Sequence, residues 1–553
     1  MSVEFTPWPV DEADLYRQQG YWIDKPLSEI LAKQVQQQPK ACAVVDAGRQ
    51  YSYQDLDVSS NRLANFLLSK GIGGKEIGGT GKGAGAKALV LLPNSAQFYA
   101  VYFALLKARV AGVYALFSHN RLEISQYLKQ LQPQVLIVSG EHPLFADDEF
   151  LTGVKAQTPS LQYIETMYSK VGLEKCWLEG EETAIADDTP AAQIANEVAF
   201  FQLSGGSTGI PKLIPRTHND YYYSVRRSVE ICQFDTNTVY LTCLPAGHNF
   251  ALSSPGALGV FVAGGTVVTA TDVSPVNCMP LIEKTGVNVA ALVPSALHLW
   301  VDYVEKTTVK PQSLNLVQVG GAKLDPQLAA KVSTVLGAQL QQVFGMAEGL
   351  VNYTRLDDDD ELIVNTQGCP MSAHDQIRVL DEQGNPVAVG EPGQLETKGP
   401  YTFRGYYQSP EHNSSAFSAD GFYRTGDVVT VSEQGYLCVV GRVKDQINRG
   451  GEKIAAEEVE TLLNSFESVA QSAVVSIPDP LLGEKSCAFI VKREPQKGCE
   501  PIKFSGVKVR KYLREEGIAA YKIPDRFVEI EALPLTAVGK TDKKKLRALY
   551  GAQ

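Results

Sequence analysis

Three short apolar stretches decide the fold of this chain. Residues 287–293 read VNVAALV, residues 314–321 read LNLVQVGG, and residues 340–345 read LQQVFG. Each stretch has the length and much of the composition of a buried strand. Glycines close the second and the third stretch, so both are expected to end in tight turns.

Helical segments separate these strands. Residues 295–305 have apolar side chains at helical spacing. A second helix is expected to begin after Asp325, with Pro326 at its first position, and to end before Gly337. Strands that alternate with helices pair in parallel, and ligands of such sheets bind beyond the carboxyl ends of the strands. The sequence therefore predicts an α/β fold with a ligand site near the glycine turns.

The C-terminal part of the chain has a different pattern. Helices are expected at 457–466 and 507–516, and strands at 469–477, 487–491 and 526–530. These elements predict a small α+β unit. The charged, glycine-flanked stretch 441–451 is expected to join this unit to the larger α/β region.

Composition limits the classes of function. The chain has 553 residues, a net charge of −11 and a pI near 5.3. This acidic balance argues against non-specific nucleic-acid binding, which needs a basic face. The nine cysteines form no CxxC pair, so reduced thiols are expected. The sequence has neither a signal-peptide pattern nor an apolar run of the roughly 18 residues that a membrane span needs, so a cytoplasmic protein is expected.

The strongest signal for chemistry is Ser204-Gly205-Gly206-Ser207-Thr208-Gly209-Ile210-Pro211-Lys212, which follows an apolar strand at 198–203. Glycines let backbone N–H groups approach an anion, and the hydroxyls and the lysine add donors and charge, so this segment suits a polyphosphate. The alternative is a flexible turn. A second glycine-rich segment, residues 71–87, lacks the spacing of a nucleotide phosphate loop and is expected to be a flexible surface loop.

The segment 204–212 resembles the phosphate loop of the adenylate-forming superfamily, which includes acyl-CoA synthetases, peptide-synthetase adenylation domains and firefly luciferase. Four further motifs of that superfamily follow in order: FGMAE at 344–348, YRTGD at 423–427, GRVKDQINRGGEKI at 441–454 and PLTAVGK at 534–540. The resemblance covers the chain apart from the glycine-rich loop. It implies that the protein uses ATP to activate a carboxylate as an acyl-adenylate.

The resemblance implies catalytic roles for three residues. Lys540 is expected to stabilise charge on the carboxylate and the α-phosphate, and Glu348 to hold Mg²⁺ against phosphate oxygens. His248 is expected to act as a gate that moves when a pantetheine arm enters. The alternatives are a solvated basic tail for Lys540, an exposed turn for Glu348 and a satisfied pocket histidine for His248.

The same resemblance implies a nucleotide site. Asp427, with Arg442 nearby, is expected to bind the ribose hydroxyls, because a carboxylate offers two acceptor oxygens. Phe344 is expected against the adenine, unless it is an ordinary core residue. The residues expected to bind ATP are Ser204, Gly205, Gly206, Ser207, Thr208, Gly209, Lys212, Gly320, Gly321, Ala322, Phe344, Gly345, Met346, Ala347, Asp427, Arg442 and Lys444.

The resemblance also divides the chain into an adenylation core at 1–441, a hinge at 442–450 and a mobile C-terminal domain at 451–553. Lys444 and Asp445 are expected at the pivot, because hinges are a few boundary residues that absorb the backbone change. The C-terminal domain is expected to rotate after adenylation, so that Lys540 withdraws and another face serves thioester formation.

Residues 215–223 and 345–357 narrow the resemblance to the aryl-acid ligases of siderophore assembly. Where adenylation domains for amino acids have an aspartate, this chain has His248-Asn249, and an amide suits phenolic hydroxyls better than an ammonium group. Asn249 is expected to bond the 2-hydroxyl and Ser254 the 3-hydroxyl of 2,3-dihydroxybenzoate. Salicylate ligases of this group tend to have cysteine in place of Ser254. The residues expected to bind the acid are Asn249, Ser254, Val343, Val351 and Gly345.

The implied reaction converts the acid and MgATP to an aryl-adenylate and then transfers the aryl group to a phosphopantetheine thiol. The sequence contains no carrier module, so an aryl carrier protein is expected to act in trans. The alternatives are salicylate as the acid, coenzyme A as the acceptor, and a non-catalytic paralogue. The presence of Lys540, Glu348 and Asp427 argues against the last alternative.

Overall fold

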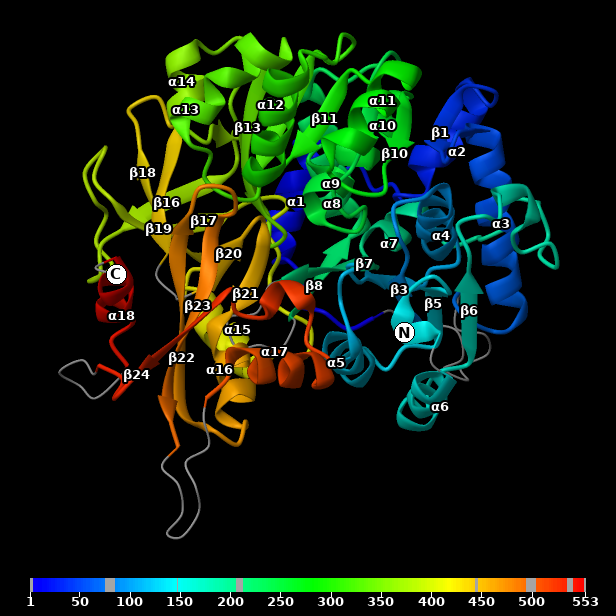
Figure 1. Ribbon diagram of the computed structural model, residues 1–553. Coiled ribbons are helices and arrows are strands. Elements are labelled where there is room, and N and C mark those ends of the chain that lie inside the picture. The colour runs from blue at the N-terminus through cyan, green and yellow to red at the C-terminus, as the bar shows by residue number, and fades with distance from the viewer. Residues whose placement is uncertain are drawn as a thin grey trace.

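The computed structural model describes residues 3–74, 85–146, 148–204, 212–442, 446–493, 504–534 and 541–551. Four β-sheets organise these residues. Figure 1 shows the N-terminal region in blue to yellow and the C-terminal strands and helices, in orange and red, against one side of it. No helix in the described ranges is long and apolar enough to cross a membrane.

The largest sheet has nine strands in the order β15-β14-β13-β12-β11-β9-β10-β1-β2. Its strands are β1 (Cys42–Asp46), β2 (Arg49–Ser52), β9 (Val239–Thr242), β10 (Thr266–Thr269), β11 (Val289–Leu292), β12 (Leu316–Gly320), β13 (Gln339–Met346), β14 (Leu350–Tyr353) and β15 (Cys369–Pro370). The central pairs from β1 to β13 are parallel. The predicted parallel arrangement of the three apolar stretches is therefore confirmed.

A six-stranded sheet has the order β6-β5-β3-β4-β7-β8 and is parallel except for its last pair. Its strands are β3 (Lys87–Leu91), β4 (Ala111–Tyr114), β5 (Val135–Ser139), β6 (Tyr163–Met167), β7 (Val198–Ser204) and β8 (Lys212–Thr217). The predicted strand before the Ser204 motif is confirmed as β7. Ser204 and Lys212 are register partners, so the residues between them join β7 to β8.

A four-stranded antiparallel sheet completes the N-terminal region in the order β16-β17-β18-β19. Its strands are β16 (Gln376–Leu380), β17 (Gly393–Lys398), β18 (Tyr423–Val431) and β19 (Leu437–Arg442). The helices of the region are α1 (Val10–Gln18), α2 (Glu29–Gln37), α3 (Tyr53–Ser69), α4 (Ala96–Lys107), α5 (Arg121–Leu131), α6 (Asp148–Gln157), α7 (Ala191–Ala195), α8 (His218–Cys232), α9 (Asn249–Ser253), α10 (Gly256–Ala263), α11 (Pro275–Thr285), α12 (Pro294–Thr307), α13 (Pro326–Ala329), α14 (Asp360–Asn365) and α15 (Pro410–Ala416).

The C-terminal region has its own five-stranded sheet, in which β24 pairs in parallel with β23 and the other pairs are antiparallel. Its elements are β20 (Gln446–Arg449), β21 (Glu452–Ala455), α16 (Ala456–Asn464), β22 (Val469–Asp479), β23 (Gly483–Lys492), α17 (Gly506–Glu515), β24 (Arg526–Ile530) and α18 (Lys543–Gly551). All five predicted elements of this region are confirmed, as is the α/β plus α+β fold.

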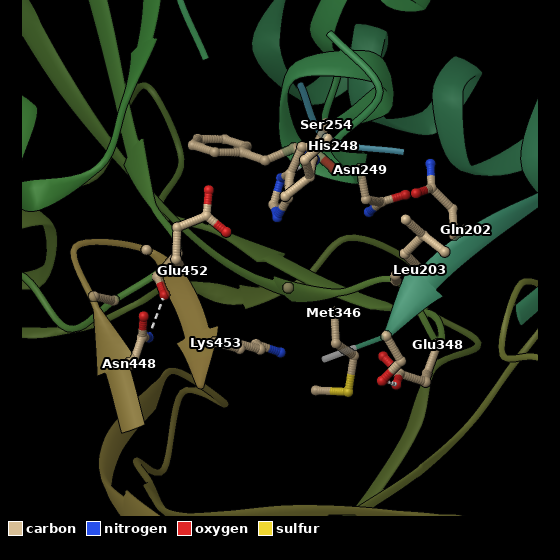
Figure 2. A pocket seen from close by; sticks show the side chains of 18 of the residues that line it. Gln202, Leu203, His248, Asn249, Ser254, Met346, Glu348, Asn448, Glu452 and Lys453 are labelled. Carbon is tan, nitrogen blue, oxygen red and sulfur yellow. Dashed lines mark hydrogen bonds between the residues drawn. The ribbon is translucent and has the colours of Figure 1, made fainter. Parts of the chain in front are cut away.

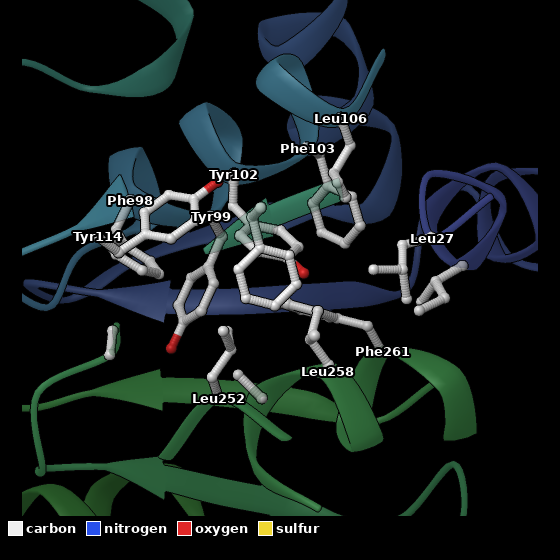
Figure 3. Packing of buried hydrophobic residues seen from close by; sticks show 14 of the residues in the cluster. Leu27, Phe98, Tyr99, Tyr102, Phe103, Leu106, Tyr114, Leu252, Leu258 and Phe261 are labelled. Atoms are coloured by element: carbon white, nitrogen blue, oxygen red, sulfur yellow. The ribbon is translucent and has the colours of Figure 1, made fainter. Parts of the chain in front are cut away.

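Helix α4 forms the centre of the largest core. The side chains from Ala96 to Leu106 are all buried, because α4 contacts strands of both large sheets, β1 and β4. Figure 3 shows Tyr99 and Phe103 of this helix against Phe261 of α10. The ring centroids of Tyr99 and Phe103 lie 5.4 and 5.7 Å from that of Phe261. A helix that is apolar all round packs in this way between layers. The core thereby fixes the two sheets whose edges form the site.

Two predicted elements differ in detail. The helix expected up to Gly337 ends early as α13 and continues as a π-helical turn, Val332–Leu336, which buries both of its end residues before Gly337 stops it at φ 72°. Gly345 lies inside β13 instead of following the strand, because the chain turns back only after Met346 and pairs Gly345 with Val351 of β14.

Candidate functional site

One cavity lies where the N-terminal sheets meet the C-terminal region. Its walls are the end of β7, helix α9, strand β13, strand β18 and the β20–β21 turn. The predicted residues that line it are Ser204, Gly321, Ala322, Val343, Phe344, Gly345, Met346, Ala347, Glu348, Asp427, His248, Asn249 and Ser254. The structure thus brings together residues from motifs that are far apart in the sequence.

Glu348 is a buried carboxylate of this cavity, with 5% of its surface exposed. Its Oε1 accepts hydrogen bonds from Ser204 Oγ at 2.6 Å and from Tyr406 Oη at 2.9 Å. Burial alone would raise the pKa of Glu348, but the charge of Lys453 and the two hydroxyl donors hold that pKa below its usual value. Glu348 is therefore ionised near neutral pH.

The environment of Glu348 fits a divalent cation with oxygen ligands. Both hydroxyl donors bond to Oε1, and Oε2 receives neither of them. An ionised carboxylate is the kind of oxygen ligand that Mg²⁺ takes from proteins, with the remaining positions filled by water and phosphate. The described residues contain no cluster of three or more acidic, histidine or cysteine side chains that could hold a metal by itself.

A glycine turn at the end of β12 forms the second wall. A Cβ atom on Gly320 would lie 2.6 Å from the backbone oxygen of Val343, and Gly321 has φ 85°, so both positions need glycine. Gly321, Ala322 and Phe344 line the cavity, whereas Gly320 does not. Backbone without bulky side chains, together with an aromatic ring in the same lining, can accommodate a nucleobase.

Asp427 lines the same cavity as this turn. It is a residue of β18 with 3% of its surface exposed, and its backbone N–H bonds to Thr425 Oγ1 at 3.0 Å. It is the register partner of Arg442 in β19. The side chain of Arg442 lies outside the described part of the structure, so its expected contact with the ribose stays a prediction.

Another part of the cavity lining contains the residues that the resemblance assigns to the acid. Asn249 Oδ1 accepts a hydrogen bond from Tyr221 Oη at 2.9 Å, and Tyr221 in turn accepts one from Gln202 Nε2 at 3.1 Å. The carbonyl oxygen of Asn249 is therefore engaged, and its amide N–H₂ remains as a donor toward the cavity. Ser254 and Val343 are buried residues of the lining, while Val351, the strand partner of Gly345, does not line the cavity.

His248 stands at the N-terminus of α9. Its Nδ1 accepts a hydrogen bond from the Phe250 backbone N–H at 3.3 Å, which places the proton of the neutral ring on Nε2. The ring is open to the cavity but surrounded by protein, and this desolvation together with the charge of Lys453 lowers its pKa to about 4. His248 is therefore a neutral hydrogen-bond donor near pH 7.

Several predicted residues are not at the cavity surface or cannot be located. Lys212 is buried, bonds to His412 and lies over the Tyr406 ring at 5.1 Å, and Tyr406 in turn donates a hydrogen bond to Glu348. The predicted site and hinge residues that lie outside the described ranges are Gly205, Gly206, Ser207, Thr208, Gly209, Lys444, Asp445 and Lys540. Their roles stay predictions, as does the structure of 75–84 within the glycine-rich loop.

The C-terminal region contributes a wall that the sequence reasoning did not assign. Asn448, Glu452 and Lys453 of the β20–β21 hairpin line the cavity, and Figure 2 shows the Lys453 side chain pointing toward Met346 and Glu348. Asn448 Nδ2 bonds to the Gly321 backbone oxygen at 2.6 Å. These residues belong to the quoted 441–454 motif. The motif indicates that this segment lies near the site, but it does not predict which of its side chains line the cavity.

A buried ion pair fixes this arrangement. Lys522 Nζ lies 3.0 Å from Glu123 Oε1 of α5 and 2.8 Å from both oxygens of Glu458 in α16. Glu123 also accepts a hydrogen bond from the Ala519 backbone N–H at 3.1 Å, and the Leu122 N–H bonds to the Gly517 oxygen at 3.1 Å. These contacts join the C-terminal region to the N-terminal region beside the cavity.

Known proteins share this sequence over its length. The sequence matches the family described as AMP-binding enzyme over residues 31–407 and the AMP-binding enzyme C-terminal domain over residues 458–540. It is 52% identical over 549 residues to enterobactin synthase component E of Escherichia coli, covering 99% of this chain and 98% of that protein. It is 48% identical over 550 residues to the vibriobactin-specific 2,3-dihydroxybenzoate-AMP ligase of Vibrio cholerae, covering 100% of this chain and 98% of that ligase.

The fold also has a solved counterpart. The apo structure of MbtA from Mycobacterium smegmatis superimposes with a TM-score of 0.72 at 38% sequence identity, and the match covers 98% of each chain. Both regions of this chain, including the C-terminal sheet, therefore have equivalents in one known protein.

Proposed function

The chain belongs to the AMP-binding enzyme family, and we propose that it activates 2,3-dihydroxybenzoate with ATP and passes the aryl group to a thiol. The products of the first step are the aryl-adenylate and pyrophosphate. The acceptor of the second step is the phosphopantetheine thiol of an aryl carrier protein that acts in trans. The observation that carries the proposal is the single cavity in which Glu348, Asp427, Asn249 and Ser254 meet.

The first step must bring two anions together, the acid carboxylate and the triphosphate. Lys540 and the donors of the 204–212 segment supply positive charge and hydrogen bonds, and each such donor contributes on the order of 10²–10³-fold in rate. Asp427 orients the ribose, and the Gly321 turn and Phe344 hold the adenine. These contacts place the carboxylate oxygen in line with the α-phosphorus. Mg²⁺ bound at Glu348 would neutralise phosphate charge.

The acid is selected by hydrogen bonds in a buried pocket. The Asn249 amide N–H₂, left over after its oxygen binds Tyr221, donates to the 2-hydroxyl oxygen. Ser254 contacts the 3-hydroxyl, and the side chain of Val343 packs on the ring. An acid that lacks one hydroxyl leaves its partner unpaired in a buried place, which costs about 1–3 kcal/mol. The name of one similar protein, the vibriobactin-specific 2,3-dihydroxybenzoate-AMP ligase, supports the same acid.

The second step uses a different position of the C-terminal region. We assign the hinge to residues 442–450, with Lys444 and Asp445 as the pivot, between the adenylation core at 1–441 and the mobile domain at 451–553. The β20–β21 hairpin supports an arrangement suited to transfer, since it lines the cavity with Asn448 and Lys453. We place the reaction in the cytoplasm, where the free cysteines found throughout the described residues remain reduced.

The proposal is tested by incubating the full-length protein with 2,3-dihydroxybenzoate, ATP and Mg²⁺. The expected result is release of pyrophosphate and formation of the aryl-adenylate, identified by mass spectrometry, and neither without the acid. Pyrophosphate release that does not depend on any aryl acid would overturn the proposal.

A further inference from the structure

Glu452 is the least explained side chain of the cavity. It is the first residue of β21, on the C-terminal wall, and Figure 2 shows its carboxylate pointing into the cavity on the side of His248. Within the described residues, no hydrogen bond or salt bridge engages this carboxylate. Leaving a partly buried carboxylate without such a partner costs free energy, so a catalytic role is one explanation for its presence.

The surroundings of Glu452 suit a proton acceptor. Desolvation raises its pKa to about 7, and the only opposing influence is the more distant charge of Lys522. Lys522 is already paired with Glu123 and Glu458. The other charged or titratable groups that face this side of the cavity are Tyr127, Tyr521, His119, His248 and Lys453.

The other candidate groups are occupied or have the wrong charge. Glu348 is held by Ser204 and Tyr406, and Glu458 binds Lys522 through both oxygens. His248 has too low a pKa to take a proton efficiently near pH 7. The Lys453 ammonium is a cation. Glu452 is therefore the lining group whose proton affinity best matches a thiol reaction at neutral pH.

We propose that Glu452 is the general base that accepts the thiol proton during aryl transfer. The inference rests on the proposed function and adds a catalytic residue to its second step. The S–H proton moves to the Glu452 carboxylate as the sulfur attacks the carbonyl carbon of the aryl-adenylate. A C–S bond forms, the C–O bond to phosphate breaks, and AMP leaves with the bonding electron pair. Solvent then takes the proton from the carboxyl group.

The position of Glu452 in the chain makes the base specific to this step. It belongs to the C-terminal region and lines the cavity in the arrangement held by the Asn448 contact to Gly321 and by the Lys522–Glu123 pair. A base that arrives with the C-terminal wall is absent while the adenylate forms. The separation protects the adenylate from premature general-base attack by water.

The experiment compares Glu452→Gln with the unaltered protein and with Glu457→Gln, a control at an exposed residue of α16. Adenylation is followed by acid-dependent pyrophosphate exchange, and transfer by the single-turnover reaction of preformed aryl-adenylate with pantetheine. Glu452→Gln is expected to slow transfer about 10²-fold relative to adenylation, the usual contribution of a general base. Glu452→Asp, which keeps the carboxylate, is expected to recover part of the loss.

The pH profile and the acidity of the thiol separate a base from a structural role. Transfer by the unaltered protein is expected to rise with pH through about 7, as Glu452 loses its proton, and then level off. In Glu452→Gln it should rise only toward the pKa of the thiol itself, roughly 8.5, and a more acidic thiol should reduce the deficit. An unchanged transfer rate, or a deficit that is independent of pH and thiol acidity, would overturn the assignment of Glu452. Failure of the unaltered protein to show acid-dependent exchange would instead refute the proposed function.

Discussion

Lys522 Nζ lies 3.0 Å from Glu123 Oε1, and this buried contact joins the C-terminal region to helix α5. Glu123 is 1% exposed and Lys522 is 6% exposed, with Glu458 completing a group of one cation and two carboxylates. Burial acts against the charge on Lys522, but the two carboxylates raise its pKa above the usual value. The ion pair therefore holds the β20–β21 hairpin at the cavity.

Replacing Lys522 by methionine is expected to release this contact. Removing one partner leaves Glu123 and Glu458 buried without a cation, which costs about 3–5 kcal/mol unless the two regions separate. Hydrogen exchange of residues 119–124 and 517–522 should therefore accelerate, and aryl transfer should fall more than adenylation. Lys508→Met, at an exposed position of α17, is the matched control. Exchange as slow as in the unaltered protein would show that the pair does not hold the regions together.

Replacing Glu348 by glutamine tests the proposed metal site. The amide keeps the size and the acceptor for Ser204 and Tyr406 but removes the negative charge. Adenylation is expected to fall about 100-fold and to need more Mg²⁺ for half of its maximal rate. Pyrophosphate exchange measured across Mg²⁺ concentrations checks this, with Glu361→Gln on the exposed side of α14 as the control. An unchanged Mg²⁺ dependence would contradict the assignment.

Replacing Lys540 by alanine is expected to separate the two steps. Loss of its charge should reduce adenylation by at least about 10²-fold, because the developing negative charge loses a donor. Transfer from aryl-adenylate supplied in the assay should be retained, because the β20–β21 hairpin provides the wall for that step. Lys544→Ala, at an exposed position of α18, is the control within the same basic segment. Equal losses in both steps would contradict a role limited to adenylation.

Replacing Ser254 by cysteine is expected to change the preferred acid. The thiol is a weaker hydrogen-bond partner for a 3-hydroxyl, so the ratio of kcat/KM for 2,3-dihydroxybenzoate to that for salicylate should fall about tenfold. Ser224→Cys, at a buried residue of α8 that does not line the cavity, is the control. A ratio that does not change would remove Ser254 from the recognition of the 3-hydroxyl.

The sequence predicts the elements of this fold better than their exact ends. The strands β11, β12 and β13 are found because each is a short apolar run between clear helix signals. The π-helical turn before Gly337 is missed, since the spacing of its buried residues also fits an α-helix. The inclusion of Gly345 in β13 is missed because strand β14, which pairs with it, lies later in the chain.

The sequence predicts only part of the candidate site. The resemblance to the adenylate-forming superfamily identifies Glu348, Asp427 and Asn249, and all three line the cavity. The resemblance does not reveal Glu452, because its place at the cavity depends on how the C-terminal region sits. That orientation is set by long-range contacts such as Lys522 with Glu123, which leave no local pattern in the sequence. The sequence also does not reveal that Lys212, which was expected to bind ATP, contacts Tyr406, because this contact arises only in the folded chain.

The most direct test of the central claim is pyrophosphate exchange measured in parallel with 2,3-dihydroxybenzoate, salicylate and benzoate. The expected order of kcat/KM is 2,3-dihydroxybenzoate, then salicylate, then benzoate, with about a tenfold or larger loss for each missing hydroxyl. A higher kcat/KM for salicylate or benzoate than for 2,3-dihydroxybenzoate would contradict the account of a cavity built around both hydroxyls.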